Sequence, residues 1–249
     1  EIGVRLVGSE MCIRDRDGRE YTFHLRKNVV FSDGEKFDAK AVKANFDAIM
    51  ENKDRHGWLE SVRLFDEFET PDDYTFKIKL KEPYYPMLIE LGSIRPFRFI
   101  SPKAMKNGKS TKNGVDKYVG TGPYVLKSNK TDEEAVFEVN DKYWGTKPKI
   151  KRIRVKVIPE EQTRALALEK GDIDIVFGRD MIDSETFKKF KDKKGFSAIM
   201  SEPVATRMML VNTTKGALAD KNVRKALQHV LNKKEISEGI FEGTETPAD

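Results

Sequence analysis

The sequence predicts a mixed α/β fold, because segments with strand-like alternation and segments with helical spacing follow one another along the chain. The clearest strand pattern lies at residues 74–81, where apolar and polar side chains alternate as in a half-buried strand. The clearest helix pattern follows Asp38, a good capping residue, and places Val42 and Phe46 at helical spacing. The composition of the 249 residues, 38% hydrophobic and 35% charged, is that of a globular protein.

Further elements follow from the same patterns. Strands are predicted at residues 21–25, 153–158, 173–177 and 208–211. A hairpin is predicted in which the strand at 125–126 pairs with 135–139 across residues 129–134. Helices are predicted at residues 86–91, 159–170, 184–191 and 222–232. The last of these is amphipathic, and its inward positions are Val223, Ala226, Leu227, Val230 and Leu231.

The charge balance invites comparison with nucleic-acid-binding proteins. The chain has 46 Lys and Arg residues against 41 Asp and Glu residues, a net charge of +5. The two signs are interspersed along the chain, and no groove-reading motif occurs, so we expect a solvated surface and no nucleic-acid partner. No apolar run approaches the roughly 20 residues of a membrane-spanning helix.

Catalytic and metal-binding motifs are absent from the sequence. The three histidines, His24, His56 and His229, are too far apart for a metal-binding pair on one helix, and no GxSxG, phosphate-binding or EF-hand loop occurs. A hydrolase would require a nucleophile with a base, which the sequence does not display. We therefore predict no catalytic residue and no enzyme activity.

Two non-periodic segments place arginines beside aromatic rings: residues 55–58 (RHGW) and 95–99 (RPFRF). An arginine guanidinium offers paired donors to a carboxylate in bidentate geometry, and an indole offers a flat apolar wall. Such segments suit an anionic organic ligand. The same residue types also form cation–π and surface contacts, so composition alone leaves both interpretations open.

Several longer motifs resemble the successive signatures of family 5 solute-binding proteins, the capture subunits of ABC importers. The motifs are YTFHLRKNVVFSDGEKFDAKAVKANFDAI from residue 21, GTGPY at 120–124, YWGTKPKI at 143–150, IPEEQTRALALEKGDIDI from 158 and VNTTKGALADKNVRKALQHVLNKKEI from 211. The resemblance extends over residues 17–249. It implies a periplasmic-binding-protein-like, two-lobed α/β fold of the class II, cluster C type, which closes on its ligand by hinge motion.

Within this family, RHGWL at residues 55–59 and PYYPMLIELGSIRPFRF at 83–99 resemble the nickel-binding branch. That resemblance implies nickel carried inside a small organic polycarboxylate chelator. Arg55 and Arg95 would bind the carboxylates and Trp58 would form a pocket wall, with His56 and Arg98 as pocket neighbours. The histidine metal ligand of this branch belongs to the distal lobe, past residue 249, so we predict no metal ligand in this chain.

The resemblance also implies a setting for the protein. We expect a monomer in the periplasm, or outside the cell on a lipid anchor, that passes a metal chelate to the permease of an ABC importer. The alternative within the family is an oligopeptide- or dipeptide-binding subunit. Such a subunit would recognise the backbone and termini of a peptide and would not depend on Arg55 and Arg95.

The same resemblance predicts a fragment of a longer protein. Residues 17–204 would be part of the first lobe with its accessory subdomain, and residues 205–249 would begin the second lobe. Residues 1–16 (EIGVRLVGSEMCIRDR) instead resemble a translated sequencing-adaptor sequence, and we expect this segment to be non-native. It contains the single cysteine, Cys12, and one cysteine excludes an intrachain disulfide.

Overall fold

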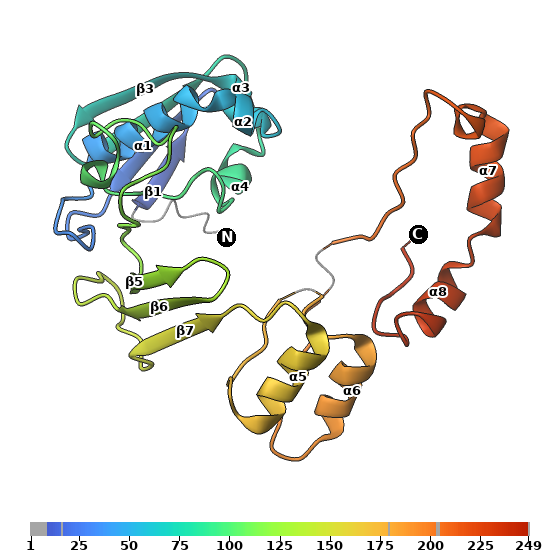
Figure 1. Cartoon of the computed structure of the whole chain (residues 1–249). Coiled ribbons are helices and arrows are strands. Elements are labelled where there is room, and N and C mark those ends of the chain that lie inside the picture. Colours follow the sequence, from blue (N-terminus) through green and yellow to red (C-terminus); the bar gives the residue numbers. More distant parts are fainter. Residues whose placement is uncertain (1–8, 16, 179, 203–204, 249) are drawn as a thin grey trace. The chain divides into compact units, whose positions relative to one another are not determined.

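The computed structural model describes residues 9–15, 17–178, 180–202 and 205–248 (Figure 1). The chain divides into two compact units, residues 1–157 and 158–249. Both units contain helices, and among the described residues the strands all belong to the first unit. None of the helices in the described ranges is long and apolar enough to cross a membrane.

An antiparallel four-stranded sheet lies in the first unit, in the order β1-β2-β4-β3. Its strands are β1 (Ser9–Arg14), β2 (Glu20–Leu25), β3 (Phe65–Asp72) and β4 (Thr75–Leu80). In β2 and β4 every second side chain is buried, because successive residues of a strand point to opposite faces. The strands predicted at 21–25 and 74–81 are thereby confirmed, whereas the sequence pattern does not predict β3.

The edge strand β1 falls inside residues 1–16, the segment that we expect to be non-native. It pairs with β2 through the main chain, with Ile13 opposite Thr22. Main-chain pairing is open to almost any sequence, so the strand is compatible with either origin of the segment. The non-native origin stays a prediction. The lobe boundary at 204 and 205 also stays a prediction, because residues 203–204 lie outside the described residues.

Helix α1 (Ala39–Glu51) packs on the sheet over β3 and β4. The Asp38 carboxylate accepts a hydrogen bond from the Ala41 N–H at 2.8 Å, which confirms the predicted N-cap. The buried side chain of Asn45 donates to the Ile100 carbonyl and accepts from the Ile100 N–H, each at 2.9 Å. This amide pair holds the irregular segment around Ile100 against the helix.

Aromatic side chains fill the core between α1 and the sheet. The Phe46 ring is fully buried, with its centroid 4.9 Å from that of Phe76 and 5.6 Å from that of Phe65. Tilted and edge-on contacts of this kind are favourable for aromatic rings. Phe97, 6.1 Å from Phe46, brings a loop segment onto the same core. The other large side chains less than 2% exposed are Tyr21, Phe23, Val29, Phe31, Phe37, Val42, Val62, Ile78 and Met87.

Short helices connect the elements of this core. They are α2 (Lys53–His56), α3 (Glu60–Leu64), α4 (Met87–Leu91) and the 3-10 turn η1 (Pro102–Ala104). Helix α4 confirms the helix predicted at 86–91. It buries Met87 and Leu91, which lie four residues apart on one side of the helix.

A second antiparallel sheet in the first unit has the order β5-β6-β7. Its strands are β5 (Tyr124–Lys130), β6 (Glu134–Val139) and β7 (Arg152–Lys156). They confirm the hairpin predicted with 135–139 and the strand predicted at 153–158. Exposed ion pairs join Arg152 to Glu138 and Arg154 to Glu134, each at 2.7 Å, and such surface pairs add little stability.

The regular elements described in the second unit are all helices or helical turns, joined by irregular segments. The elements are α5 (Glu161–Lys170), α6 (Ser184–Asp192), the 3-10 turn η2 (Ala217–Ala219), α7 (Lys221–Val230) and α8 (Lys233–Gly239). Helices α5 and α6 confirm the predictions at 159–170 and 184–191. Helix α5 ends at Gly171, whose φ of 78° lies in the left-handed region that glycine adopts without strain. The Asp183 side chain caps α6 by accepting from the Thr186 N–H at 2.7 Å.

Two strands predicted in this unit are wrong, because residues 173–177 and 208–211 contain no strand. A strand needs a neighbour to pair its main-chain groups, and the described part of residues 158–249 offers none. The helix predicted at 222–232 ends at Val230. A new helix, α8, then begins after Asn232, whose side chain caps it by accepting from the Glu235 N–H.

The predicted inward face of α7 is also wrong. No residue of this helix is buried, and Val230 is 79% exposed. Val223 and Leu227 are half-buried, whereas Ala226 and Leu231 are exposed. The apolar stripe exists in the sequence, but the described residues of this unit do not cover it.

Candidate ligand-binding site

The predicted site residues lie on two surface segments of the first unit. The Arg55 segment, residues 55–58, runs from the end of α2 toward α3 and carries Arg55, His56 and Trp58. The Arg95 segment, residues 94–98, follows α4 and carries Arg95 and Arg98. Helices α2, α3 and α4 lie at one side of the unit in Figure 1. A hydrogen bond from the Ser61 N–H on α3 to Glu90 on α4 joins α3 to α4.

Both segments are anchored in the same core. Leu59, directly after Trp58, is 4% exposed, and Phe97, two residues after Arg95, is 6% exposed. Leu59 and Phe97 belong to one hydrophobic cluster. Trp58 itself is 64% exposed. The buried neighbours therefore fix the main chain of each segment while the predicted site residues remain at the surface.

Glu90 joins α4, which precedes the Arg95 segment, to α3, which follows the Arg55 segment. Its Oε2 accepts a hydrogen bond from the Ser61 N–H at 3.0 Å, and its Oε1 accepts one from the Tyr84 hydroxyl at 2.6 Å. Burial alone would raise the pKa of the Glu90 carboxyl, but the hydrogen bonds from Ser61 and Tyr84 outweigh burial and lower this pKa. The carboxylate is therefore ionised at neutral pH and accepts from Ser61, just after the Arg55 segment, and from Tyr84, just before α4.

The arginines of the site carry free donors. The guanidinium groups of Arg55, Arg95 and Arg98 make no hydrogen bond or ion pair with the described residues. On neighbouring α3, by contrast, Arg63 pairs with Glu60 at 3.1 Å. An exposed guanidinium without a protein partner can bind a carboxylate through two parallel hydrogen bonds.

His56 differs from the arginines because it is half-buried. Burial, and secondly the positive charge of Arg55, lower the pKa of its imidazole. The neutral ring is therefore favoured at neutral pH, and a neutral ring nitrogen can accept a hydrogen bond. His56 adds no positive charge to this surface.

Large apolar side chains flank the two segments and remain exposed. Ile89 is 67% exposed on α4, Tyr85 is 78% exposed before it, and Ile94 is 74% exposed in the Arg95 segment. Contiguous exposed apolar side chains are typical of contact surfaces. The sequence did not single out Ile89, because α4 is too short for its pattern to separate buried from exposed positions.

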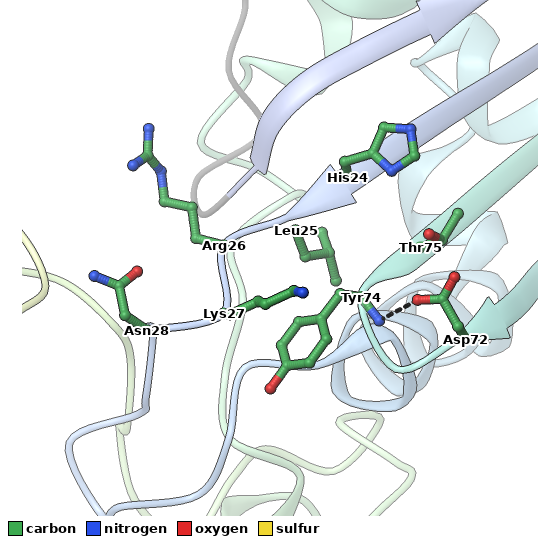
Figure 2. Close-up of a pocket in the computed structure, with 8 residues that line it drawn as sticks. All are labelled: His24, Leu25, Arg26, Lys27, Asn28, Asp72, Tyr74 and Thr75. Carbon is green, nitrogen blue, oxygen red and sulfur yellow. Dashed lines mark hydrogen bonds between the residues drawn. The ribbon is translucent and has the colours of Figure 1, made fainter.

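A separate surface hollow lies at the end of β2 and at the turn between β3 and β4 (Figure 2). Several of its polar groups already have protein partners. The Lys27 ammonium lies 5.8 Å from the Tyr74 ring centroid, the Arg26 guanidinium lies 4.9 Å from that of Trp144, and Asp72 accepts from the Tyr74 N–H at 2.8 Å. We assign no ligand to this hollow, which is lined by His24, Leu25, Arg26, Lys27, Asn28, Asp72, Tyr74 and Thr75.

Residues 14–249 match a known family, described as bacterial extracellular solute-binding proteins, family 5 (middle). The chain belongs to this family. It is 41% identical to the nickel-binding periplasmic protein of Escherichia coli strain K12 over 234 residues, which are 94% of the chain and 44% of that protein. The resemblance to the nickel-binding branch is thereby confirmed. The chain spans less than half the length of this relative.

Solved structures of family members have the same fold. NikA from Brucella suis, in complex with Fe(III)-EDTA, matches with a TM-score of 0.91 and 45% identity over 97% of this chain and 49% of the NikA chain. DppA from Helicobacter pylori, in complex with the peptide STSA, matches with a TM-score of 0.75 and 26% identity over 95% of this chain and 49% of that chain. These likenesses confirm the periplasmic-binding-protein-like α/β fold for the part that this chain spans.

In the described ranges, no three His, Cys, Asp or Glu side chains lie together in a way that could hold a metal ion. The predicted site residues Arg55, Arg95 and Trp58 are cationic and aromatic groups, and such groups can bind an organic anion. The positions of Arg55, Trp58 and Arg95 are compatible with ligand binding, and their role stays a prediction.

Proposed function

We propose that the protein is the solute-binding subunit of an ABC importer and captures nickel held inside a small polycarboxylate chelator. The observation that carries this proposal is the placement of Arg55, Arg95 and Trp58. Among the described residues, the exposed guanidinium groups of Arg55 and Arg95 have no partner, and the Trp58 indole is exposed. These groups lie on segments anchored in one core, next to α3 and α4, which the hydrogen bond from Ser61 to Glu90 joins.

Each group has a distinct role in this proposal. Arg55 and Arg95 each bind a carboxylate of the chelator by charge-assisted hydrogen bonds. The Trp58 ring covers an apolar part of the ligand. His56 and Arg98 are neighbours of the bound ligand and not its main contacts.

The metal is cargo in this proposal. Because the chelator fills most of the coordination positions of nickel, the protein recognises the organic shell and needs few metal ligands of its own. Two relatives support this reading. One is named for nickel binding, and NikA from Brucella suis was crystallised with iron bound to EDTA, which is a polycarboxylate.

The setting of the protein is proposed from its family. The ligand is passed without chemical change to a membrane permease, and the protein acts as a monomer in the periplasm or on an extracellular lipid anchor. In the complete protein, residues 17–204 belong to the first lobe and residues 205–249 begin the second.

A peptide-binding subunit is the second candidate. The likeness to DppA from Helicobacter pylori, which was crystallised with a bound peptide, supports it. An extended peptide is held mainly through its backbone and termini, so its binding would depend little on Arg55 and Arg95.

Calorimetric titration distinguishes the two candidates. The chain, extended to the length of its relatives, is titrated with nickel in a small polycarboxylate chelator, with bare nickel and with mixed short peptides. Tight binding of the chelate alone is the expected result. Binding of peptides alone would refute the proposal and assign the protein to the peptide-binding candidate.

A further inference from the structure

We infer that Glu90 is a positioning residue, which sets the placement of the Arg55 segment relative to the Arg95 segment. This inference rests on the proposed function, because these segments carry the residues proposed to bind the chelate. Glu90 itself is not proposed to touch the ligand. Both of its carboxylate oxygens already accept hydrogen bonds within the protein, and an anionic ligand would be repelled by it.

The start of α3 depends on Glu90. The N–H groups in the first turn of a helix have no partner within the helix, and a side chain usually caps them. The N-cap residue of α3 is Leu59, which cannot do so, and no side-chain cap is present there. Glu90, 29 residues away in the sequence, supplies the missing acceptor to the Ser61 N–H. The start of α3 is thus fixed by a residue of α4.

The position of Trp58 follows from this contact. Trp58 is the residue immediately before Leu59, so the start of α3 determines where the main chain of Trp58 lies. Without the Glu90 acceptor, the first turn of this five-residue helix loses its external hydrogen bond. We expect the segment that carries Trp58 to become less ordered.

Glu90 is itself attached to the core and to the sheet. Its helix, α4, is held in the core by Met87 and Leu91, and Arg95 follows Glu90 by five residues. The Tyr84 hydroxyl donates to Glu90, and the Tyr84 carbonyl accepts from the Tyr21 hydroxyl on β2 at 3.0 Å. These contacts extend from the sheet through Tyr84 and Glu90 to α3. Because the Arg55 segment leads into α3 and the Arg95 segment follows α4, Glu90 sets the distance between the two segments.

The test without ligand uses Trp58 as its own probe. The chain has two tryptophans, Trp58 and Trp144, and the Trp144 Nε1 is buried without a hydrogen-bond partner among the described residues. A Trp144→Phe background therefore isolates the Trp58 signal. In this background Glu90→Ala should change the emission and acrylamide quenching of Trp58. Glu90→Gln should restore both, because an amide can accept from Ser61 and donate to the Tyr84 oxygen.

Two further variants keep this test decisive. Glu138→Ala removes a carboxylate paired with Arg152 in the other sheet and should leave Trp58 unchanged. If Glu90→Ala does not fold, Tyr84→Phe removes only one of the two hydrogen bonds to Glu90 and should change Trp58 quenching in the same direction by a smaller amount. Unchanged Trp58 quenching in Glu90→Ala, or in Tyr84→Phe where it is the readable variant, would overturn the inference.

The test with ligand is the dissociation constant of the extended chain for nickel in a small polycarboxylate chelator. Glu90→Ala should weaken binding about tenfold, and Glu90→Gln should bind as wild type does. The effect of Glu90→Ala should be smaller in an Arg95→Ala background, because both changes act on the same contacts. The inference would be overturned if the losses of binding free energy caused by Glu90→Ala and Arg95→Ala add fully in the double variant. Unchanged affinity in Glu90→Ala would also overturn it.

These two tests separate the inference from the proposed function. If the wild-type protein does not bind the chelate, the proposed function fails. The quenching of Trp58 in the ligand-free chain then still decides whether Glu90 positions the Arg55 segment.

Discussion

Phe46 on α1 and Val230 on α7 occupy equivalent positions, the apolar face of an amphipathic helix, but only one of them is buried. Phe46 is fully enclosed by the rings of Phe65, Phe68 and Phe76, whereas Val230 is 79% exposed. The difference shows that an apolar stripe predicts a helix, but burial requires a partner surface. In the first unit the sheet provides that surface.

The largest expected effect comes from removing the Phe46 ring. Phe46→Ala should lower the free energy of unfolding of the first unit by about 3–5 kcal/mol, because it leaves a cavity at the centre of the aromatic core. Val230→Ala should change the free energy of unfolding of the second unit by less than about 0.5 kcal/mol. Urea unfolding measures both variants, with tryptophan fluorescence for Phe46→Ala, since Trp58 and Trp144 belong to the first unit, and with helical circular dichroism for Val230→Ala. Equal effects of the two variants would contradict the comparison.

A polar contact in the same core should have the next largest effect. Asn45→Ala leaves the N–H and the carbonyl of Ile100 without their partner, and we expect a loss of about 1–3 kcal/mol of unfolding free energy. The matched control is Asn129→Ala, an exposed amide in β5, which should have almost no effect. Urea midpoints that fall equally in both variants would show that the Asn45 contact does not hold the Ile100 segment.

The helix caps sharpen the comparison between the units. Asp38→Ala removes the cap of α1 and should lower the stability of the first unit by about 1 kcal/mol. Asp183→Ala removes the equivalent cap of α6 in the second unit. It should decrease the helical circular dichroism signal and leave the tryptophan-detected transition unchanged. A shift of that transition in Asp183→Ala would mean that the two units unfold together.

The smallest expected effect is a pH dependence that arises from Glu90. Because the hydrogen bonds from Ser61 and Tyr84 outweigh burial and lower its pKa, the folded state binds this proton less readily than the unfolded state. The resulting stabilisation is fully present above the ordinary carboxyl pKa of about 4.3 and is lost as the pH falls through the lowered pKa. The difference in unfolding free energy between wild type and Glu90→Gln should therefore shrink in acid. A constant difference from pH 7 to pH 3 would contradict this assignment.

The sequence predicts the elements whose pattern is local. The alternation in β4 and the Asp38 cap of α1 are such patterns, and the structure confirms both. The apolar runs at 173–177 and 208–211 resemble strands, but a strand also needs a pairing partner, which a local pattern does not reveal. Strand β3 is missed because its acidic residues and Pro71 hide the alternation, and its ladder contains register shifts.

The candidate site is predictable only in part for the same reason. Residue types and family resemblance predict Arg55, Trp58 and Arg95, and the structure adds that they lie exposed on segments with one shared core. The sequence does not predict Glu90, because its importance depends on a hydrogen bond from Ser61, a residue 29 positions away. A lone glutamate on a short helix carries no local signal of such a contact.

The most direct measurement of the central claim is a calorimetric titration with nickel in a small polycarboxylate chelator. It compares the extended wild-type protein with Arg95→Ala and with Arg63→Ala, in which the removed arginine already pairs with Glu60. We predict that Arg95→Ala weakens binding by about 1.5–3 kcal/mol through the loss of a charge-assisted contact, and that Arg63→Ala binds as wild type does. Unchanged affinity in Arg95→Ala would contradict the assignment of this arginine to the chelate.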